Sequence, residues 1–375
     1  MDFVKEWVAN EDDLIREGAS LGALLARMKD VFHPLLFSRG EYQRLIKLAS
    51  GLPPTLAGFP LWIGFPIDNS PPGLLLDVSV LSGTRSAQIF EDMDLVSTAG
   101  VVPLLRQIGS EQSSLKRIVG NRVLLQYEIP AGQPAKQGLL LYPEQTMLAA
   151  NGSDEGHQNF GIALHALADA AGQTLNAAEH QQLEHAWLAL DAGTRVGVIG
   201  VFPQQRLRVT RLVMLGLSSV ADVVAFLDRV GWTGKSALVA ATLQRLDALG
   251  ALAGMTFGVQ LDLHAEGMAP VIELQVFSAE TIYDPTGWFK DKHCWTALLN
   301  GLAAGSLLVP DKLAELTRWS MGTRTLIGRS GLLLLLQRIH HFALAFGSDG
   351  EIKYVNAHVF MLLNQWSKKS NGSTS

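Results

Sequence analysis

The sequence is poor in cysteine and has no excess of positive charge. Its only cysteine is Cys294, which excludes an intramolecular disulfide and a multi-cysteine metal site, and which favours a reducing compartment. Lys and Arg total 30 against 35 Asp and Glu, so the chain as a whole does not attract a nucleic-acid backbone or an anionic membrane surface. We therefore expect a cytoplasmic protein with no nucleic-acid partner and no membrane partner. The sequence does not indicate its oligomeric state.

A secretion signal and long hydrophobic runs are also missing. Residues 1–17 are rich in acidic side chains and lack the basic start and apolar run of a signal peptide, so they are expected to form an amphipathic helix. The most apolar run, residues 331–336, is much shorter than the roughly 20 residues that a membrane helix needs, and it is expected to lie in the core. Residues 367–375 are polar and are expected to form a disordered tail.

Signatures of several common enzyme classes are absent. The chain has no Gly-x-Ser-x-Gly, no Walker loop and no His-Glu-x-x-His. Gly197-Val-Ile-Gly200 is followed by Val201 and Phe202 instead of a third glycine and a helix, so it is typical of a strand and not of a dinucleotide loop. Pairs such as His180 and His185 lack the spacing of metal ligands on one helix face. We expect neither a metal site nor a cofactor.

What the sequence does contain is a regular series of paired strands. A chain of 375 residues with 48% hydrophobic content can bury a large core. Alternation of apolar and polar residues, bounded by turn residues such as Ser348-Asp349-Gly350, predicts hairpins. The predicted hairpins span residues 59–80, 122–142, 195–215, 255–277 and 340–360.

Helical patterns fill the intervals between these hairpins. Asn176 and Glu179 have the spacing of a capping box, which marks the start of a helix. Helices are predicted near residues 12–29, 40–50, 176–191, 220–230, 235–249, 295–304 and 311–319.

This alternation of hairpins and helices constrains the fold. Successive hairpins favour one antiparallel sheet with helices on its outer face, and closure of ten strands into a barrel removes both sheet edges. We predict an α/β fold of repeated helix-strand-strand-helix units, in which a ten-stranded antiparallel β-barrel is surrounded by helices. Residues 1–50 are expected to be N-terminal helices that pack on the barrel, and residues 51–366 to be the barrel domain.

This architecture resembles the ABBA-type aromatic prenyltransferases, in which five helix-strand-strand-helix units close into a ten-stranded antiparallel barrel. The resemblance covers roughly residues 50 to 365 and rests on strand number, strand order and length. It implies a metal-independent transferase of natural-product biosynthesis, which moves an isoprenoid group from its diphosphate to an aromatic or peptidic acceptor.

Several predicted strands carry their polar residues on one face. These sets are Asp77 with Ser79; Arg122, Gln126 and Glu128; Arg206, Arg208 and Thr210; Gln260, Asp262 and His264; Glu273 with Gln275; and Tyr354, Asn356 and His358. Alternation alone allows two interpretations, a face exposed to water or the lining of a central chamber. We favour the chamber, because polar groups that converge in a concave space are typical of a small-molecule site.

The resemblance also implies roles for these residues. Arg122, Arg206 and Arg208 would hold the diphosphate, and Glu128, Asp262 or Glu273 would accept the proton. Substrate would also contact Gln126, Gln260, His264, Gln275, Tyr354, Asn356 and His358. The Lys-x-Tyr pairs of the family are absent, Asn356-Ala-His358 stands where one is expected, and four carboxylates outnumber the three arginines. An alternative therefore stays open: a non-catalytic protein that uses the same barrel to bind a small molecule or a peptide.

Overall fold

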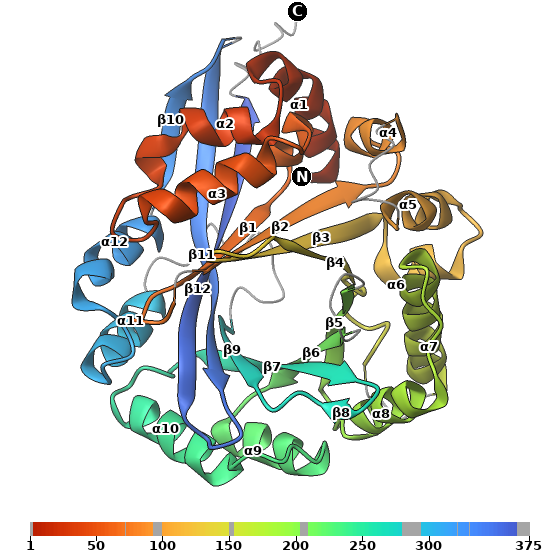
Figure 1. Ribbon diagram of the computed structural model, residues 1–375, viewed down its shortest axis with the longest axis vertical. Helices are drawn as coiled ribbons and strands as arrows, with labels where there is room; N and C mark the ends of the chain where they lie inside the picture. The colour runs from red at the N-terminus through yellow and green to blue at the C-terminus, as the bar shows by residue number, and fades with distance from the viewer. Residues whose placement is uncertain are drawn as a thin grey trace, which may run out of the picture.

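A ring of β-strands lies at the centre of the molecule, and helices lie around its outside (Figure 1). The computed structural model describes residues 3–71, 73–92, 100–149, 154–202, 209–279, 294–320, 322–329 and 331–365. The strands of the ring are β1 (Leu61–Pro66), β2 (Gly73–Leu81), β3 (Arg122–Pro130), β4 (Lys136–Leu141), β5 (Arg195–Phe202), β6 (Val209–Leu217), β7 (Met255–His264), β9 (Ile272–Ser278), β11 (Leu332–Phe346) and β12 (Ile352–Gln365).

The ring closes because the last two hairpins pair with each other and the last pairs with the first. β9 is antiparallel to β11, with Val276 opposite Phe342, and β12 is antiparallel to β1, with Met361 opposite Leu61. The predicted ten-stranded antiparallel barrel and its five hairpins are confirmed. Two further strands flank the ring: β10 (Thr323–Ile327), which was not predicted, pairs with β11, and the short β8 (Gly267–Met268) lies between β7 and β9 and pairs with β7.

Helices precede or follow each hairpin. They are α1 (Phe3–Glu17), α2 (Leu21–Arg27), α3 (Arg39–Ala49), α4 (Arg85–Asp92), α5 (Val101–Gly109), α6 (Ser114–Val119), α7 (Asp154–Ala170), α8 (Ala177–Leu188), α9 (Val220–Arg229), α10 (Ser236–Ala248), α11 (Cys294–Ala304) and α12 (Pro310–Ser320), with 3-10 turns η1 (Lys29–Val31) and η2 (Pro54–Gly58). The predicted capping box begins α8, because Asn176 accepts from the Glu179 backbone N–H while the Glu179 carboxylate accepts from that of Asn176.

The outer face of the barrel packs against these helices as the main core. On β7, Phe257, Val259 and Leu261 are at most 2% exposed and belong to this core. Burying one such side chain stabilises the fold by about 1.5–3 kcal/mol. Gln260 and Asp262 alternate with them and therefore face the inside of the ring. On β7 the apolar side thus faces outward and the polar side faces inward.

The helices in the described ranges do not have the length and apolar character that crossing a lipid bilayer requires. In the same ranges, no group of three or more His, Cys, Asp or Glu is arranged to hold a metal ion. The predicted tail at residues 367–375 lies outside the described residues.

Candidate active site in the barrel

A cavity of about 930 Å³ occupies the inside of the barrel, and all ten strands of the ring contribute to its lining. This volume falls in the upper part of the range of sites that bind drug-sized molecules. Part of the wall is apolar: a second hydrophobic cluster, separate from the main core, includes Trp62, Leu140, Val213 and Phe277. Polar side chains of the same strands, such as Arg211 on β6 and Glu273 on β9, line the rest of the cavity.

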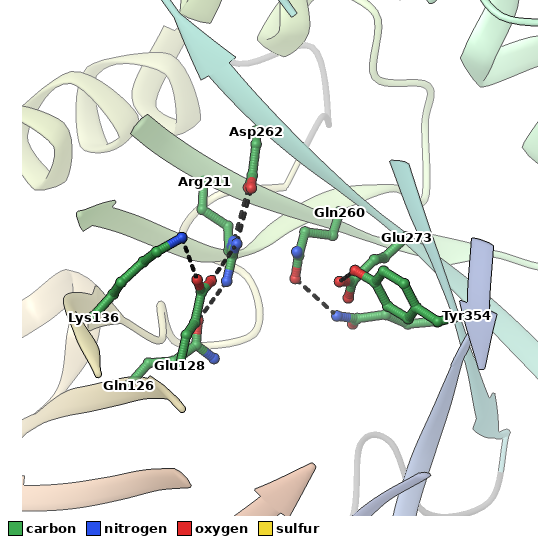
Figure 2. Close-up of polar contacts among 9 residues, drawn as sticks. Gln126, Glu128, Lys136, Arg211, Gln260, Asp262, Glu273 and Tyr354 are labelled. Atoms are coloured by element: carbon green, nitrogen blue, oxygen red, sulfur yellow. Dashed lines mark hydrogen bonds and ion pairs between the residues drawn. The ribbon is translucent and has the colours of Figure 1, made fainter. Parts of the chain in front are cut away.

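Arg211 on β6 is the centre of the largest polar network in the lining (Figure 2). It forms a two-pronged ion pair with Asp262, which lies directly opposite on β7, at 2.8 Å from Nε to Oδ1 and 2.9 Å from Nη2 to Oδ2. Nη2 also donates to Glu128 Oε1 at 3.0 Å, and Nη1 donates to Gln126 Oε1 at 2.6 Å. The guanidinium lies over the Phe202 ring, 4.4 Å from its centroid.

This network keeps Arg211 positively charged and uses most of its N–H donors. Burial alone would lower the pKa of Arg211, but the charge and hydrogen bonds of Asp262 and the charge of Glu128 raise it well above its ordinary value. Lys136 Nζ lies 3.9 Å from the second oxygen of Glu128 (Figure 2). Arg211 and Lys136 are therefore already paired with carboxylates.

Glu273 on β9 accepts a hydrogen bond of 2.5 Å from the Tyr354 hydroxyl of β12 (Figure 2). Burial raises the pKa of Glu273, and the nearby charge of Arg211 offsets this only in part. Beside this pair, the Gln275 amide lies 3.5 Å from the Gln260 carbonyl oxygen. Glu273 is thus less acidic than an exposed glutamate.

Asp77 on β2 is a second carboxyl of the lining with a raised pKa. It lies opposite Trp62 of β1 and opposite Gln126 of β3. Burial raises the pKa of Asp77 to about 7, although a hydrogen bond from Gln126 and the charge of Arg211 act in the opposite direction. One of its oxygens, Oδ1, is buried and has no hydrogen-bond partner among the described residues.

Arg122 begins β3 and lines the cavity at the other end of this strand from Glu128. Its guanidinium lies 5.2 Å from the centroid of the Tyr142 ring. Burial lowers the pKa of Arg122, while Tyr142 and Glu144 favour the charged form. No carboxylate of the described residues lies within 4.0 Å of this guanidinium, in contrast to Arg211. Arg195 of β5 lines the same end of the cavity.

The structure places most of the predicted site residues in this cavity. The lining includes Arg122, Gln126, Glu128, Gln260, Asp262, Glu273, Gln275, Tyr354, Asn356 and His358. His264 is not part of it, because it lies at the end of β7, where that strand pairs with Gly267. Arg206 and Arg208 lie outside the described residues.

The comparisons with known proteins agree with this architecture. The sequence matches no protein-family model and no curated protein. Its structure is similar to that of the prenyltransferase PriB, with a TM-score of 0.54 and 15% identity over 91% of this chain and 96% of that chain. It is also similar to the prenyltransferase NotF in complex with brevianamide F and DMSPP, with a TM-score of 0.51 and 10% identity over 90% and 92% of the two chains.

A third structure is that of 6-dimethylallyltryptophan synthase from Micromonospora olivasterospora in complex with DMASPP and Trp. The TM-score is 0.50, and the 13% identity extends over 95% of this chain and 96% of that chain. The chain has the ABBA prenyltransferase fold. The architectural resemblance seen in the sequence is therefore confirmed. The chemistry of a shared fold depends on the residues of its cavity.

Within the ABBA barrel, the structure corrects one polar face at Thr210, which is the described member of that face. The predicted face of β6 was Arg206, Arg208 and Thr210, but Thr210 alternates with Arg211 and shares its side of the strand with the outward-facing Leu212 and Met214. The charged residue of β6 that faces inward is Arg211. The signal that could have found it is the complementary charge of Asp262, since hairpin order makes β6 and β7 neighbours.

Proposed function

We propose that this ABBA barrel transfers an isoprenoid group from its diphosphate to an aromatic or peptidic acceptor, and that it does so without a metal ion. The observation that carries the proposal is one continuous cavity that combines an aromatic and apolar wall, an arginine with no carboxylate partner among the described residues, and a carboxyl group with a raised pKa. The similar structures of prenyltransferases support it. The single cysteine favours the cytoplasm as the place of action.

In this proposal Arg122 binds the diphosphate. Hydrogen bonds from a guanidinium to phosphate oxygens are among the strong ones, because both partners are charged. Arg122 is suited to this task because no carboxylate of the described ranges neutralises its charge at close range, and Arg195 lines the same end of the cavity. Tyr142, next to Arg122, then lies where the isoprenoid group begins.

The chemical step requires a cation to form and a proton to leave. The allylic C–O bond breaks, and its electron pair leaves with the diphosphate. The rings of Tyr142, Trp62 and Phe277 can stabilise the resulting allylic cation through their negative faces. The acceptor then forms the new bond to the allylic carbon, and its proton passes to Asp77, whose pKa near 7 suits a general base at neutral pH.

The three carboxyls first predicted as bases are less available in this arrangement. Asp262 and Glu128 form ion pairs with Arg211, and Glu273 accepts a hydrogen bond from the Tyr354 hydroxyl. We propose that Glu128 and Asp262 position Arg211 and Gln126, and that Gln126 in turn orients Asp77 by its hydrogen bond.

The first test is ligand binding. Dimethylallyl or geranyl diphosphate at 100 times its Kd should stabilise the protein by about 2.7 kcal/mol in a thermal-shift experiment with EDTA present. Arg122→Gln should weaken this binding at least about tenfold, because a charge-assisted hydrogen bond contributes about 1.5–3 kcal/mol. Arg106→Gln, on the exposed side chain of α5, is the matched control and should bind like the wild type. If neither diphosphate stabilises the protein, the proposed prenyltransferase function is wrong.

The second test is turnover. Incubation with the diphosphate and a panel of tryptophan derivatives and peptides should yield a prenylated product detectable by mass spectrometry. Asp77→Asn should lower kcat by about 10²- to 10⁴-fold, since that is the usual contribution of a general base. Its affinity for the diphosphate should remain unchanged. A variant that keeps full kcat would show that another group takes the proton.

One observation favours a second function, a non-catalytic protein that binds a small molecule or a peptide in the same barrel. Arg211, a buried cation of the lining, is held by two carboxylates and an amide and offers little to a diphosphate. Such a binder would show ligand-induced stabilisation with aromatic or peptidic compounds and none with isoprenoid diphosphates. The thermal-shift experiment with both classes of compound distinguishes the two functions.

A further inference from the structure

β10 and the first part of β11 form a hairpin that extends beyond the ring to the top edge of the molecule (Figure 1). One face of this hairpin belongs to the main core, because Leu333 and Leu335 of β11 are at most 3% exposed and pack in that cluster. Side chains alternate along a strand, so the residues between and beside these two point to the other face. That face carries four large aliphatic side chains, which are Ile327, Leu332, Leu334 and Leu336.

These four side chains form the hairpin patch, which is most exposed at its tip. Ile327 is 85% exposed, and its cross-strand partner Leu332 is 45% exposed. Leu334 and Leu336 are partly exposed, and neither of the two hydrophobic clusters formed by the described residues includes them. Single exposed apolar side chains are common on protein surfaces, but adjacent ones on one sheet face indicate an interaction site.

The charge around the hairpin patch is positive, although the net charge of the whole chain is negative. Residues 316–348 contain four arginines and no Asp or Glu. Two of these arginines, Arg324 on β10 and Arg329 in the turn, have exposed side chains. Glu17, which approaches the turn from α1, is 1% exposed and already binds Arg27 and the backbone N–H of Arg329. The hairpin therefore favours an anionic partner.

A second copy of the chain does not suit this hairpin. β10 has only five residues, so a two-fold axis beside it would bring the Arg324 side chains of both copies close together. Like charges at an interface oppose association. The outer edge of β10 is also partly occupied, because Arg27 Nη2 donates to the Ile327 carbonyl oxygen at 3.0 Å. Pairing of β10 with another strand is therefore disfavoured.

The tip of the hairpin is suited to a surrounding of low polarity. The Gly328 N–H donates to the Gly331 carbonyl oxygen at 2.6 Å, and Arg27 binds the Ile327 carbonyl oxygen. Backbone groups that are already hydrogen-bonded can enter the edge of a lipid bilayer, whereas unbonded groups there are strongly unfavourable. An arginine beside an apolar tip can bind lipid phosphates while its methylene groups lie along apolar surface.

We propose that the hairpin patch docks this protein on an anionic membrane surface. Ile327 and Leu332 enter the boundary between headgroups and acyl chains, while Arg324 and Arg329 bind lipid phosphates. The negative net charge of the chain does not prevent this, because salt screens charges beyond about 8 Å at physiological ionic strength. The hairpin patch lies outside the lining of the barrel cavity, so docking does not depend on prenyl transfer.

Co-sedimentation with vesicles in the absence of substrate tests the docking. Vesicles of dioleoylphosphatidylcholine alone are compared with vesicles that also contain about 30% dioleoylphosphatidylserine, both in about 100 mM NaCl. The wild-type protein should bind the anionic vesicles at least about tenfold more tightly, since each arginine near an anionic surface contributes about fivefold. Raising NaCl to about 500 mM should remove most of this preference. Equal binding to the two kinds of vesicle would overturn the proposal.

Variants of the hairpin locate the contact. Ile327→Ser should weaken binding to the anionic vesicles at least about fivefold, because the lipid no longer covers a large aliphatic side chain. Arg324→Gln combined with Arg329→Gln should weaken it at least about tenfold and remove the preference for anionic lipid. The matched controls are Leu188→Ser, at a side chain of α8 that is 69% exposed, and Arg106→Gln on α5, and both should bind like the wild type.

Two further results would contradict docking of the hairpin on a membrane. Full vesicle binding by the folded Ile327→Ser variant and by the arginine double variant would mean that another surface meets the lipid. Sedimentation of the wild type as a dimer without lipid, and of Ile327→Ser as a monomer, would show that a second copy covers the hairpin patch. Analytical ultracentrifugation of both proteins measures this.

Discussion

Replacing Arg211 by methionine should lower the free energy of unfolding by about 3 kcal/mol. The arginine side chain is 8% exposed, and its removal leaves the largely buried carboxylate of Asp262 without its ion pair and that of Glu128 with only the more distant Lys136. The unpaired carboxylates, more than the lost attraction, cause the destabilisation. Urea denaturation followed by circular dichroism measures it.

A second variant separates this cause from a simple loss of packing. Arg211→Met combined with Glu128→Gln and Asp262→Asn removes the unpaired charges and should recover more than half of the lost stability. The control is Arg229→Met, which breaks an ion pair with Asp191 at the surface and should cost less than about 1 kcal/mol. If the triple variant is no more stable than Arg211→Met alone, the charges are not the reason for the effect.

The stability of the protein should also fall as the pH rises from about 4 to 7, through Asp77. Its pKa is about 7 in the folded protein against an ordinary value of 3.8 for an aspartate in water, so the folded state keeps a proton that the unfolded chain releases in this range. The contribution is fully present below pH 4 and is lost as the pH rises through 7, at about 1.4 kcal/mol per pH unit and ~4 kcal/mol in all.

Asp77→Asn isolates this contribution, because the other titrating groups cancel in the difference between the two proteins. The variant should be nearly as stable as the wild type at pH 4 and more stable by up to about 4 kcal/mol at pH 8. Urea midpoints measured at intervals of one pH unit check this. A difference that stays constant across the range would mean that Asp77 titrates normally in the folded protein.

The architecture was predictable because its signals are local. Alternation on β7 and β9 separates Leu261 and Leu274 from Asp262 and Glu273, and the turn residues between the strands mark the hairpins. The Asn176 and Glu179 capping box likewise needs only four consecutive residues. Strand number, hairpin order and the polar faces of most strands follow from such signals.

The inward face of β6 was not predictable in the same way. Val209, Val213 and Leu215 are as apolar as Leu212 and Met214 on the other side of that strand, so alternation does not tell which side meets the helices. Pairing with β7 decides it, because the register places Arg211 opposite Asp262.

The sequence by itself determined that five hairpins and their helices would form one antiparallel barrel with polar side chains inside. Tertiary structure alone decided which strands close the ring, where β11 bulges so that His340 and His341 both face inward, and how far burial raises the pKa of Asp77. The physical reason is that strand period and turn chemistry depend on neighbours in the chain. Strand pairing, bulges and desolvation depend on residues that are distant in sequence and meet only after the barrel closes.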